Sequence, residues 1–192
     1  MNHLKIRKNH DNVAPGKMPD ENPAFHTQTM ATLIRGGDVF APSPLGKKDI
    51  LILGSKIAAV SEPDEIQISG LPLVEEDASD RSVIPGFIDS HVHILGGGGE
   101  GGPATRAPEI TLQDIIGSGV TTVIGCLGTD GTTRHMESLL AKAYGLEIEG
   151  VTTFVFSGSY QVPILTITGS VRSDIALIDK IIGAGEIAIS DH

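Results

Sequence analysis

The chain has 192 residues, enough to bury a core and to form one domain, or one domain with a small companion. Its 24 acidic and 14 basic residues leave a formal net charge of −10, which argues against nucleic-acid binding, where lysine and arginine must neutralise phosphates. No membrane association is expected, because glycine, serine or a charged residue interrupts every apolar stretch before it reaches the roughly 20 residues that a spanning helix needs.

Residues 1–30 are predicted to be a disordered leader. The segment is polar and is interrupted by Pro15, Pro19 and Pro23, so it lacks the apolar stretch of a secretory signal. The single cysteine, Cys126, cannot form an internal disulfide and lies in an apolar run, where a buried thiol is favoured over a nucleophile. We therefore expect a cytoplasmic protein.

Residues 31–86 are predicted to form a small β-domain. Strands are expected at 32–40 and 49–60, with glycines at the turns, and residues 71–75 are a further candidate strand.

From residue 87 onward the pattern changes to alternating strands and helices. Strand-like apolar runs at 87–88, 120–124, 151–156 and 187–189 recur roughly every 30 residues, the length of a strand with its returning helix. Thr111 with Asp114 is typical of a helix N-terminus, and further helices are expected at about 136–146 and 173–182. This order predicts a parallel sheet, which can be a closed barrel or an open sheet because both share the βα unit.

The most specific chemistry lies in Pro-Gly-Phe-Ile-Asp-Ser-His-Val-His, residues 85–93. Residues two apart on a strand point to the same face, so His91 and His93 can offer imidazole nitrogens to one cation. For an arbitrary His-x-His pair, two solvent-exposed histidines are the commoner arrangement. Here both histidines end the first βα strand, where barrel enzymes place catalytic groups, and glycines follow at 96–99. This context favours a metal site.

The same motif after a short β-domain is similar to the entrance motif of the amidohydrolase superfamily. Across about residues 32–192 the chain resembles the isoaspartyl (β-aspartyl) dipeptidases, in motifs at 96–100, 127–130, 137–142, 158–160, 166–171 and 189–192. The resemblance implies an α/β fold in which 87–192 form the first four βα units of a (β/α)8 TIM-like metallo-dependent hydrolase barrel. Residues 31–86 would then be a small β-sandwich domain before it.

The resemblance also implies residue roles. His91 and His93 would hold the more buried of two zinc ions. The substrate pocket would be lined by Gly98, Glu100 and Thr129, and the Glu100 carboxylate would meet the α-ammonium group of the substrate.

Tyr160 is the implied catalytic residue, because its phenol would donate a hydrogen bond to the scissile carbonyl oxygen as negative charge develops there. Each single assignment has a structural alternative: Glu100 as a helix cap or solvent-facing charge, Thr129 as a turn residue, and Tyr160 as a packing ring. The shared order of the motifs favours the binding roles.

The metal-bridging position departs from the common family pattern. Many members place there a lysine carboxylated by carbon dioxide, but this chain has no lysine after Lys180. Counting back from Ser-Asp-His at 190–192 selects Glu186, whereas counting forward from Tyr160 selects Gly185. A glutamate has the same bidentate anionic head, so Glu186 is the predicted bridge; the alternative is a surface charge at the start of the last strand.

A barrel needs about eight βα units and about four fit between residues 87 and 192, so the resemblance implies a truncated chain carrying the N-terminal half of the enzyme. The expected activity is zinc-dependent hydrolysis of β-aspartyl dipeptides by a homo-oligomer, by resemblance an octamer, with this chain alone inactive. The alternatives are another amidohydrolase, such as a dihydroorotase-like cyclic amidase or an N-acetyl amino-sugar deacetylase, and an inactive fragment with only a structural or assembly role.

Overall fold

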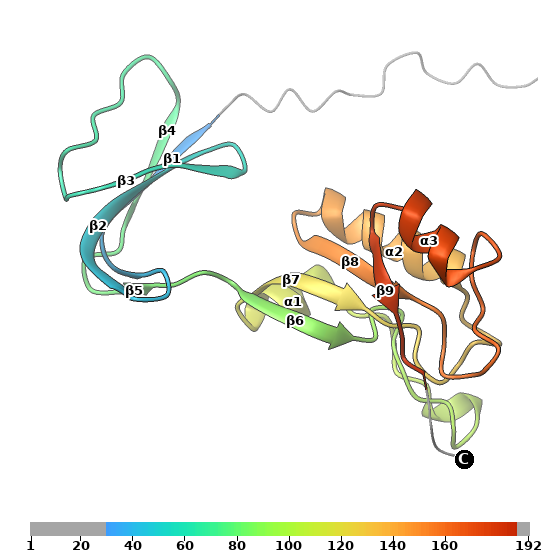
Figure 1. Cartoon of the computed structure of the whole chain (residues 1–192). Coiled ribbons are helices and arrows are strands. Elements are labelled where there is room, and N and C mark those ends of the chain that lie inside the picture. The colour runs from blue at the N-terminus through green and yellow to red at the C-terminus, as the bar shows by residue number, and fades with distance from the viewer. Residues whose placement is uncertain (1–29, 188–192) are drawn as a thin grey trace, which may run out of the picture. The chain divides into compact units, whose positions relative to one another are not determined.

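The computed structural model describes residues 30–187 (Figure 1). The chain divides into two compact units, Met1–Ile84 and Pro85–His192. Apart from Met30, the predicted leader lies outside the described residues, as do residues 188–192.

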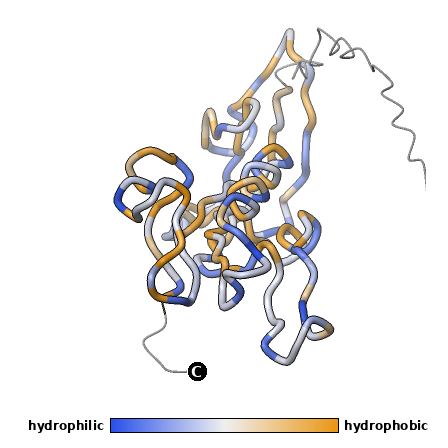
Figure 2. The backbone as a smooth tube through the Cα atoms, turned by 90° about the vertical axis from the view of Figure 1, so that its right-hand side faces the viewer, coloured by the Kyte–Doolittle hydropathy of each residue, from blue (hydrophilic) through white to orange (hydrophobic). Residues whose placement is uncertain are grey.

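No helix in the described part of the chain is long and apolar enough to cross a membrane. Hydrophobic and hydrophilic residues alternate over short distances along the backbone (Figure 2).

The first unit contains a five-stranded sheet in the order β3-β2-β1-β4, with the short β5 also paired to β1. The strands β1, β2 and β3 form antiparallel hairpins, whereas β4 and β5 run parallel to β1. The strand bounds are Ala31–Phe40 (β1), Pro44–Leu53 (β2), Lys56–Ser61 (β3), Leu73–Asp77 (β4) and Ser82–Val83 (β5). Within residues 30–84 the structure contains this one sheet, which is one of the two layers that a β-sandwich has.

A buried carboxylate, Asp49, ties the first unit together. It pairs with the Arg35 guanidinium at 3.1 Å and accepts the backbone N–H groups of Gly36 at 2.8 Å and Asp64 at 3.0 Å. Burial alone would raise the pKa of the Asp49 carboxyl, but the two backbone donors and Arg35 outweigh burial and lower the pKa. Asp49 therefore stays charged and joins β2 to β1 and to the segment that follows β3.

The second unit is a four-stranded parallel sheet in the order β6-β7-β8-β9. A helix follows each of the first three strands, which is the βα repeat that the sequence predicts (Figure 1). The elements are β6 (Phe87–Val92), a 3-10 turn (Pro103–Thr105), α1 (Leu112–Gly117), β7 (Val120–Gly125), α2 (Met136–Ile148), β8 (Thr152–Ser157), α3 (Val171–Leu177) and β9 (Ile181–Ala184).

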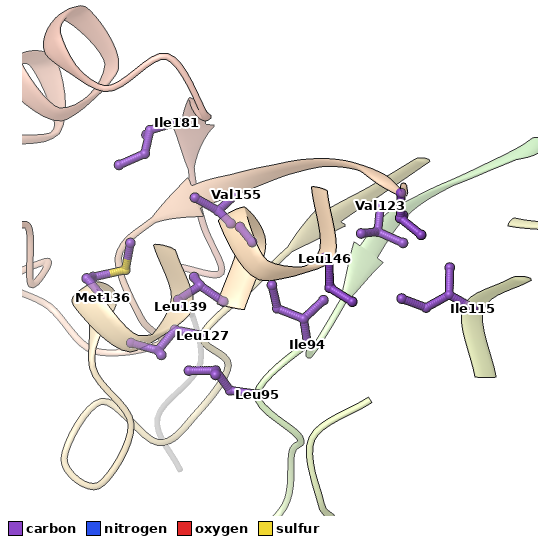
Figure 3. Packing of buried hydrophobic residues seen from close by; sticks show 12 residues of the cluster. Ile94, Leu95, Ile115, Val123, Leu127, Met136, Leu139, Leu146, Val155 and Ile181 are labelled. Atoms are coloured by element: carbon purple, nitrogen blue, oxygen red, sulfur yellow. The ribbon is translucent and has the colours of Figure 1, made fainter. Parts of the chain in front are cut away.

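The core of the second unit lies between the sheet and its helices. Leu139 and Leu146 of α2 meet Val123 of β7, Val155 of β8 and Ile181 of β9, all of them buried (Figure 3). Burying a leucine or valine side chain contributes about 1.5–3 kcal/mol, so this cluster fixes α2 across the sheet. The strand ends that carry the polar motifs are thereby held in place.

Local sequence signals placed two of the helices correctly. Thr111 caps α1 with the predicted capping box, accepting the Asp114 N–H at 3.3 Å while the Asp114 carboxylate accepts the Thr111 N–H at 3.0 Å. The second helix, α2, begins at Met136 as predicted and continues to Ile148, two residues beyond the expected end.

The third helix and the last strand were placed wrongly. The helix expected at 173–182 ends at Leu177, and Ile181–Ala184 form β9 instead. The apolar spacing extends beyond the helix because Ile181 also packs in the core, although it does so from a strand. The Lys180 carbonyl accepts the Val155 N–H of β8 at 2.8 Å, which is sheet pairing and not helix pairing. Of the strand expected at 187–189, Ile187 lies beyond β9, and 188–189 fall outside the described residues.

Candidate metal centre and adjoining pocket

Three potential metal ligands converge at the carboxyl ends of the parallel strands. His91 lies in β6, His93 follows its last residue, and Glu186 lies two residues beyond the end of β9. The two carboxylate oxygens of Glu186 lie 3.0 Å from His91 Nε2 and 3.3 Å from His93 Nε2. One ligand atom from each residue lies within 4.8 Å of the others. The structure thus brings together all three residues that were predicted from the sequence to be metal ligands.

This contact requires a curved sheet. The strands β6 and β9 are the two ends of the order β6-β7-β8-β9, so in a flat sheet about three strand spacings, roughly 14 Å, would separate them. Side chains stand nearly perpendicular to a flat sheet and could not close that distance. The 3.0 Å contact between Glu186 and His91 therefore favours the wall of a barrel over an open sheet.

The donor set fits a divalent transition metal. Imidazole nitrogen and carboxylate oxygen are the ligands that zinc takes at catalytic sites, which keep a position open for water or substrate. The side chains are 54% exposed for His91, 32% for His93 and 27% for Glu186, so the group is open on one side. Two tetrahedral zinc ions need more protein ligands than these three, which are the only such group within residues 30–187.

A glycine lets the His93 ring lie where it does. Gly128, in the loop after β7, has a φ of 78°, and a Cβ there would lie 2.4 Å from the His93 ring. Its carbonyl also accepts the backbone N–H of Tyr160 at 3.0 Å. The loops after β7 and β8 thus meet beside the histidines, and Tyr160 is half-buried three residues beyond the end of β8.

Cys126 follows the last residue of β7 and is buried, as its apolar surroundings predicted. Burial, with a smaller contribution from the Glu186 charge, raises the pKa of the Cys126 thiol to about 11. The thiol therefore stays protonated and is a poor nucleophile and a poor metal ligand.

A cavity of about 290 Å³ is lined by residues of the glycine-rich loop after β6 and of the loop after β7. Its lining includes three of the four predicted substrate-binding residues and not the fourth, Tyr160. The lining residues are Gly98, Gly99, Glu100, Pro103, Arg106, Thr129, Asp130 and Thr133.

Glu100 presents an anionic group to this cavity. The Thr129 hydroxyl donates to Glu100 Oε1 at 2.5 Å. That hydrogen bond is the largest cause of a lowered pKa of the Glu100 carboxyl; its own backbone N–H and the positive charge of Arg134 add to it. The carboxylate is open to solvent and charged at neutral pH, so it suits a cationic group of a ligand.

Two charged residues of the site were missed from the sequence. Asp130 accepts the backbone N–H groups of Thr132 at 3.0 Å and Thr133 at 2.7 Å and also the Thr133 hydroxyl. These bonds, the Thr133 hydroxyl first, lower the pKa of Asp130 to about 2. The spacing Asp-x-x-Thr is the local signal for this turn. The second residue, Arg134, is buried beneath the loop after β6, and nothing in its sequence neighbourhood indicates burial.

Comparison with solved structures identifies the relatives. The β-aspartyl dipeptidase of Fervidobacterium islandicum AW-1, solved in complex with a β-Asp-Leu dipeptide, is 52% identical with a TM-score of 0.78; the match covers 85% of this chain and 42% of that chain. The chain matches the N-terminal half of β-aspartyl dipeptidases. A second structure of the F. islandicum AW-1 enzyme agrees, at 53% identity and a TM-score of 0.76, covering 85% of this chain and 44% of that chain.

More distant relatives support the same fold. The dihydroorotase of Pelotomaculum thermopropionicum is 30% identical over 168 residues, which are 84% of this chain and 35% of that protein. A D-hydantoinase from Thermus sp. is 24% identical with a TM-score of 0.52, covering 76% of this chain and 31% of that chain. No protein-family model matches the chain.

The expected fold, the first part of an amidohydrolase barrel, is confirmed by these structures. The chain spans less than half the length of the dipeptidases that it matches.

Proposed function

We propose that the protein is a zinc-dependent β-aspartyl (isoaspartyl) dipeptidase, and that this chain supplies part of its metal centre and its ammonium-binding pocket. The observation that carries the proposal is that ligand atoms of His91, His93 and Glu186 lie close together, and that the loops after β6 and β7 form a pocket lined by the Glu100 carboxylate. The 52% identity to a β-aspartyl dipeptidase supports it.

In this proposal His91 and His93 would hold one zinc ion through their imidazole nitrogens, and Glu186 would supply the carboxylate shared with a second. The carboxylate offers two oxygens and a negative charge, both needed where two dications lie close together. Gly185, the alternative from counting along the chain, has no side chain to offer. Zinc would polarise the substrate carbonyl and lower the pKa of a bound water.

The remaining residues bind and orient the substrate. The α-ammonium group of a β-aspartyl dipeptide would pair with Glu100, whose lowered pKa keeps it charged at neutral pH. Thr129 holds the Glu100 carboxylate in one orientation through its hydroxyl. Tyr160 would donate its phenol proton in a hydrogen bond to the scissile carbonyl oxygen, where negative charge accumulates.

A dihydroorotase-like cyclic amidase is the second candidate, favoured by the 30% identity to a dihydroorotase over 84% of this chain. A cyclic amide substrate lacks the free α-ammonium group that Glu100 would bind. The two proposals therefore differ in what the 290 Å³ cavity should hold.

The test measures zinc and ligand binding by the 192-residue chain. Zinc titration should give stoichiometric binding that depends on His91 and His93. Calorimetry with β-Asp-Leu should then show binding that an N-acetylated β-Asp-Leu lacks and that Glu100→Gln abolishes. Tighter binding of dihydroorotate than of β-Asp-Leu would favour the second candidate. A folded chain that binds no zinc would refute both.

A further inference from the structure

We propose that Arg134 is the positioning residue of the candidate pocket, because its guanidinium fixes the two loops that carry Gly98, Glu100 and Thr129. The assignment of these residues to substrate binding rests on the proposed function. The role of Arg134 in holding the loops rests on contacts within the chain.

The guanidinium is surrounded by backbone oxygens of one loop. Its nitrogens donate to four carbonyl groups, those of Leu95 (3.2 Å), Gly97 (3.0 Å), Gly98 (3.3 Å) and Ala107 (3.5 Å). These carbonyls belong to the two ends of the glycine-rich loop that follows β6. The planar fork of arginine can bond in several directions at once, which an ammonium on a flexible stem cannot do.

Among the described residues, the carboxylate that forms an ion pair with this guanidinium is that of Asp130. Arg134 is 4% exposed, and burying a cation is costly unless it is paired and hydrogen-bonded. Asp130 lies 3.3 Å from Arg134 Nη1 and is held in place by the turn at Thr132 and Thr133. Asp130 and Arg134 both lie in the loop after β7, and Asp130 follows Thr129 directly, so the ion pair holds that loop. The bonds from Arg134 to the four carbonyls link it to the loop after β6.

The glycine-rich loop needs such an anchor. Gly96 has a φ of 77° and Gly98 a φ of 68°, conformations that favour glycine and that cost backbone entropy to hold. A Cβ at Gly96 would lie 2.2 Å from the Ala107 carbonyl oxygen, so the loop closes tightly on itself. The Ala107 N–H donates to the Gly97 carbonyl at 2.9 Å, and Arg134 contacts the carbonyls of both residues.

Lys180 provides a matched comparison within the same unit. It is also a buried cation, paired with Glu147 and donating to the Thr153 carbonyl at 3.0 Å. Thr153 is near the start of β8 and Lys180 precedes β9, so this pair lies at the amino ends of the strands, opposite the pocket. A general loss of stability should therefore follow from changing either cation, whereas a change in the pocket should follow from Arg134 alone.

The experiment compares Arg134→Gln, Arg134→Lys and Lys180→Gln with the parent 192-residue chain. Amide hydrogen exchange reports the Ala107 N–H, and NMR titration reports the pKa of the Glu100 carboxyl. In Arg134→Gln, exchange at Ala107 should accelerate on the order of tenfold or more relative to the core amides. The pKa of Glu100 should rise toward its ordinary value, because the Thr129 bond and the Arg134 charge are both lost. Arg134→Lys should restore only part of either property.

Lys180→Gln should lower the melting temperature and leave both pocket readouts unchanged. Equal changes in Arg134→Gln and Lys180→Gln would overturn the proposal, as would a folded Arg134→Gln with parental exchange and Glu100 pKa. If Arg134→Gln does not fold, Arg134→Lys decides by the same criteria, and its unfolding would show a general structural role and overturn the proposal. None of these readouts uses substrate, so failure of β-Asp-Leu to bind would count against the proposed function alone.

Discussion

Replacing Glu186 with glutamine tests the carboxylate at the centre of the candidate metal site. The substitution keeps the size of the side chain but removes the negative charge that lies 3.0 Å from one imidazole and 3.3 Å from the other. Opposite unit charges about 4 Å apart attract by about 1 kcal/mol in water and about 4 kcal/mol near a protein surface. Zinc carries two charges and binds a carboxylate oxygen at about 2.0–2.2 Å, so for a carboxylate that is 27% exposed we take about 2.5 kcal/mol as a lower bound. Zinc affinity should therefore fall at least on the order of 10²-fold.

The assay is zinc titration of the 192-residue chain against a competing chelator, in buffer stripped of carbon dioxide. A glutamate is already a carboxylate, whereas a lysine becomes one only by reacting with carbon dioxide. The parent chain should therefore bind zinc fully without bicarbonate. Glu100→Gln is the matched control, because it neutralises a carboxylate in the pocket and should leave zinc affinity unchanged. Parental zinc affinity in Glu186→Gln, or a requirement for bicarbonate, would refute the assignment of Glu186 as a ligand.

Three further variants separate metal binding, catalysis and folding. His91→Ala with His93→Ala should abolish zinc binding by elemental analysis, while circular dichroism stays unchanged because both rings are partly exposed. Tyr160→Phe in the whole enzyme should lower kcat for β-Asp-Leu on the order of 10²-fold at constant zinc content, whereas an unchanged kcat would mean that the ring only packs. Asp174→Asn should destabilise the chain by about 2–4 kcal/mol in urea unfolding, because the buried carboxylate accepts the Ser157 hydroxyl at 2.5 Å and nearby backbone N–H groups. Burial would raise the pKa of the Asp174 carboxyl, but these hydrogen bonds outweigh burial and lower it. The contribution of Asp174 to stability is therefore present above the unfolded pKa and is lost as pH falls through the folded pKa. In Asp174→Asn, the free energy of unfolding should depend less on pH in this acidic range.

Features that depend on neighbours in sequence could be predicted well. The capping box of Thr111 and Asp114 joins residues three apart, and the two histidines lie two apart at the end of one strand. Both signals are complete within a few residues, so no knowledge of the tertiary fold is needed to read them.

The anchor of the pocket could not be predicted, because its contacts are distant in sequence. Arg134 reaches carbonyls 27 to 39 residues away, and its local surroundings give no sign that the guanidinium is buried. Glu100 and Thr129, 29 residues apart, were brought to one site only by resemblance to a family whose strands order these loops. A sequence read alone would have left each of them as a surface residue.

The position of the last strand decides whether a three-ligand centre can form at all. Had the strand run over residues 187–189, Glu186 would stand at its amino end, about three residues or roughly 10 Å from the carboxyl end where the histidines lie. With β9 at Ile181–Ala184, the same glutamate stands just past the carboxyl end, level with His91 and His93. Ile181 sets this register by entering the core beside Val155, and the buried Lys180 holds the amino end of the strand against Glu147. The packing at the amino ends of the strands therefore places the Glu186 carboxylate at their carboxyl ends. For this reason the assignment of Glu186 as a ligand depends on where α3 ends and β9 begins.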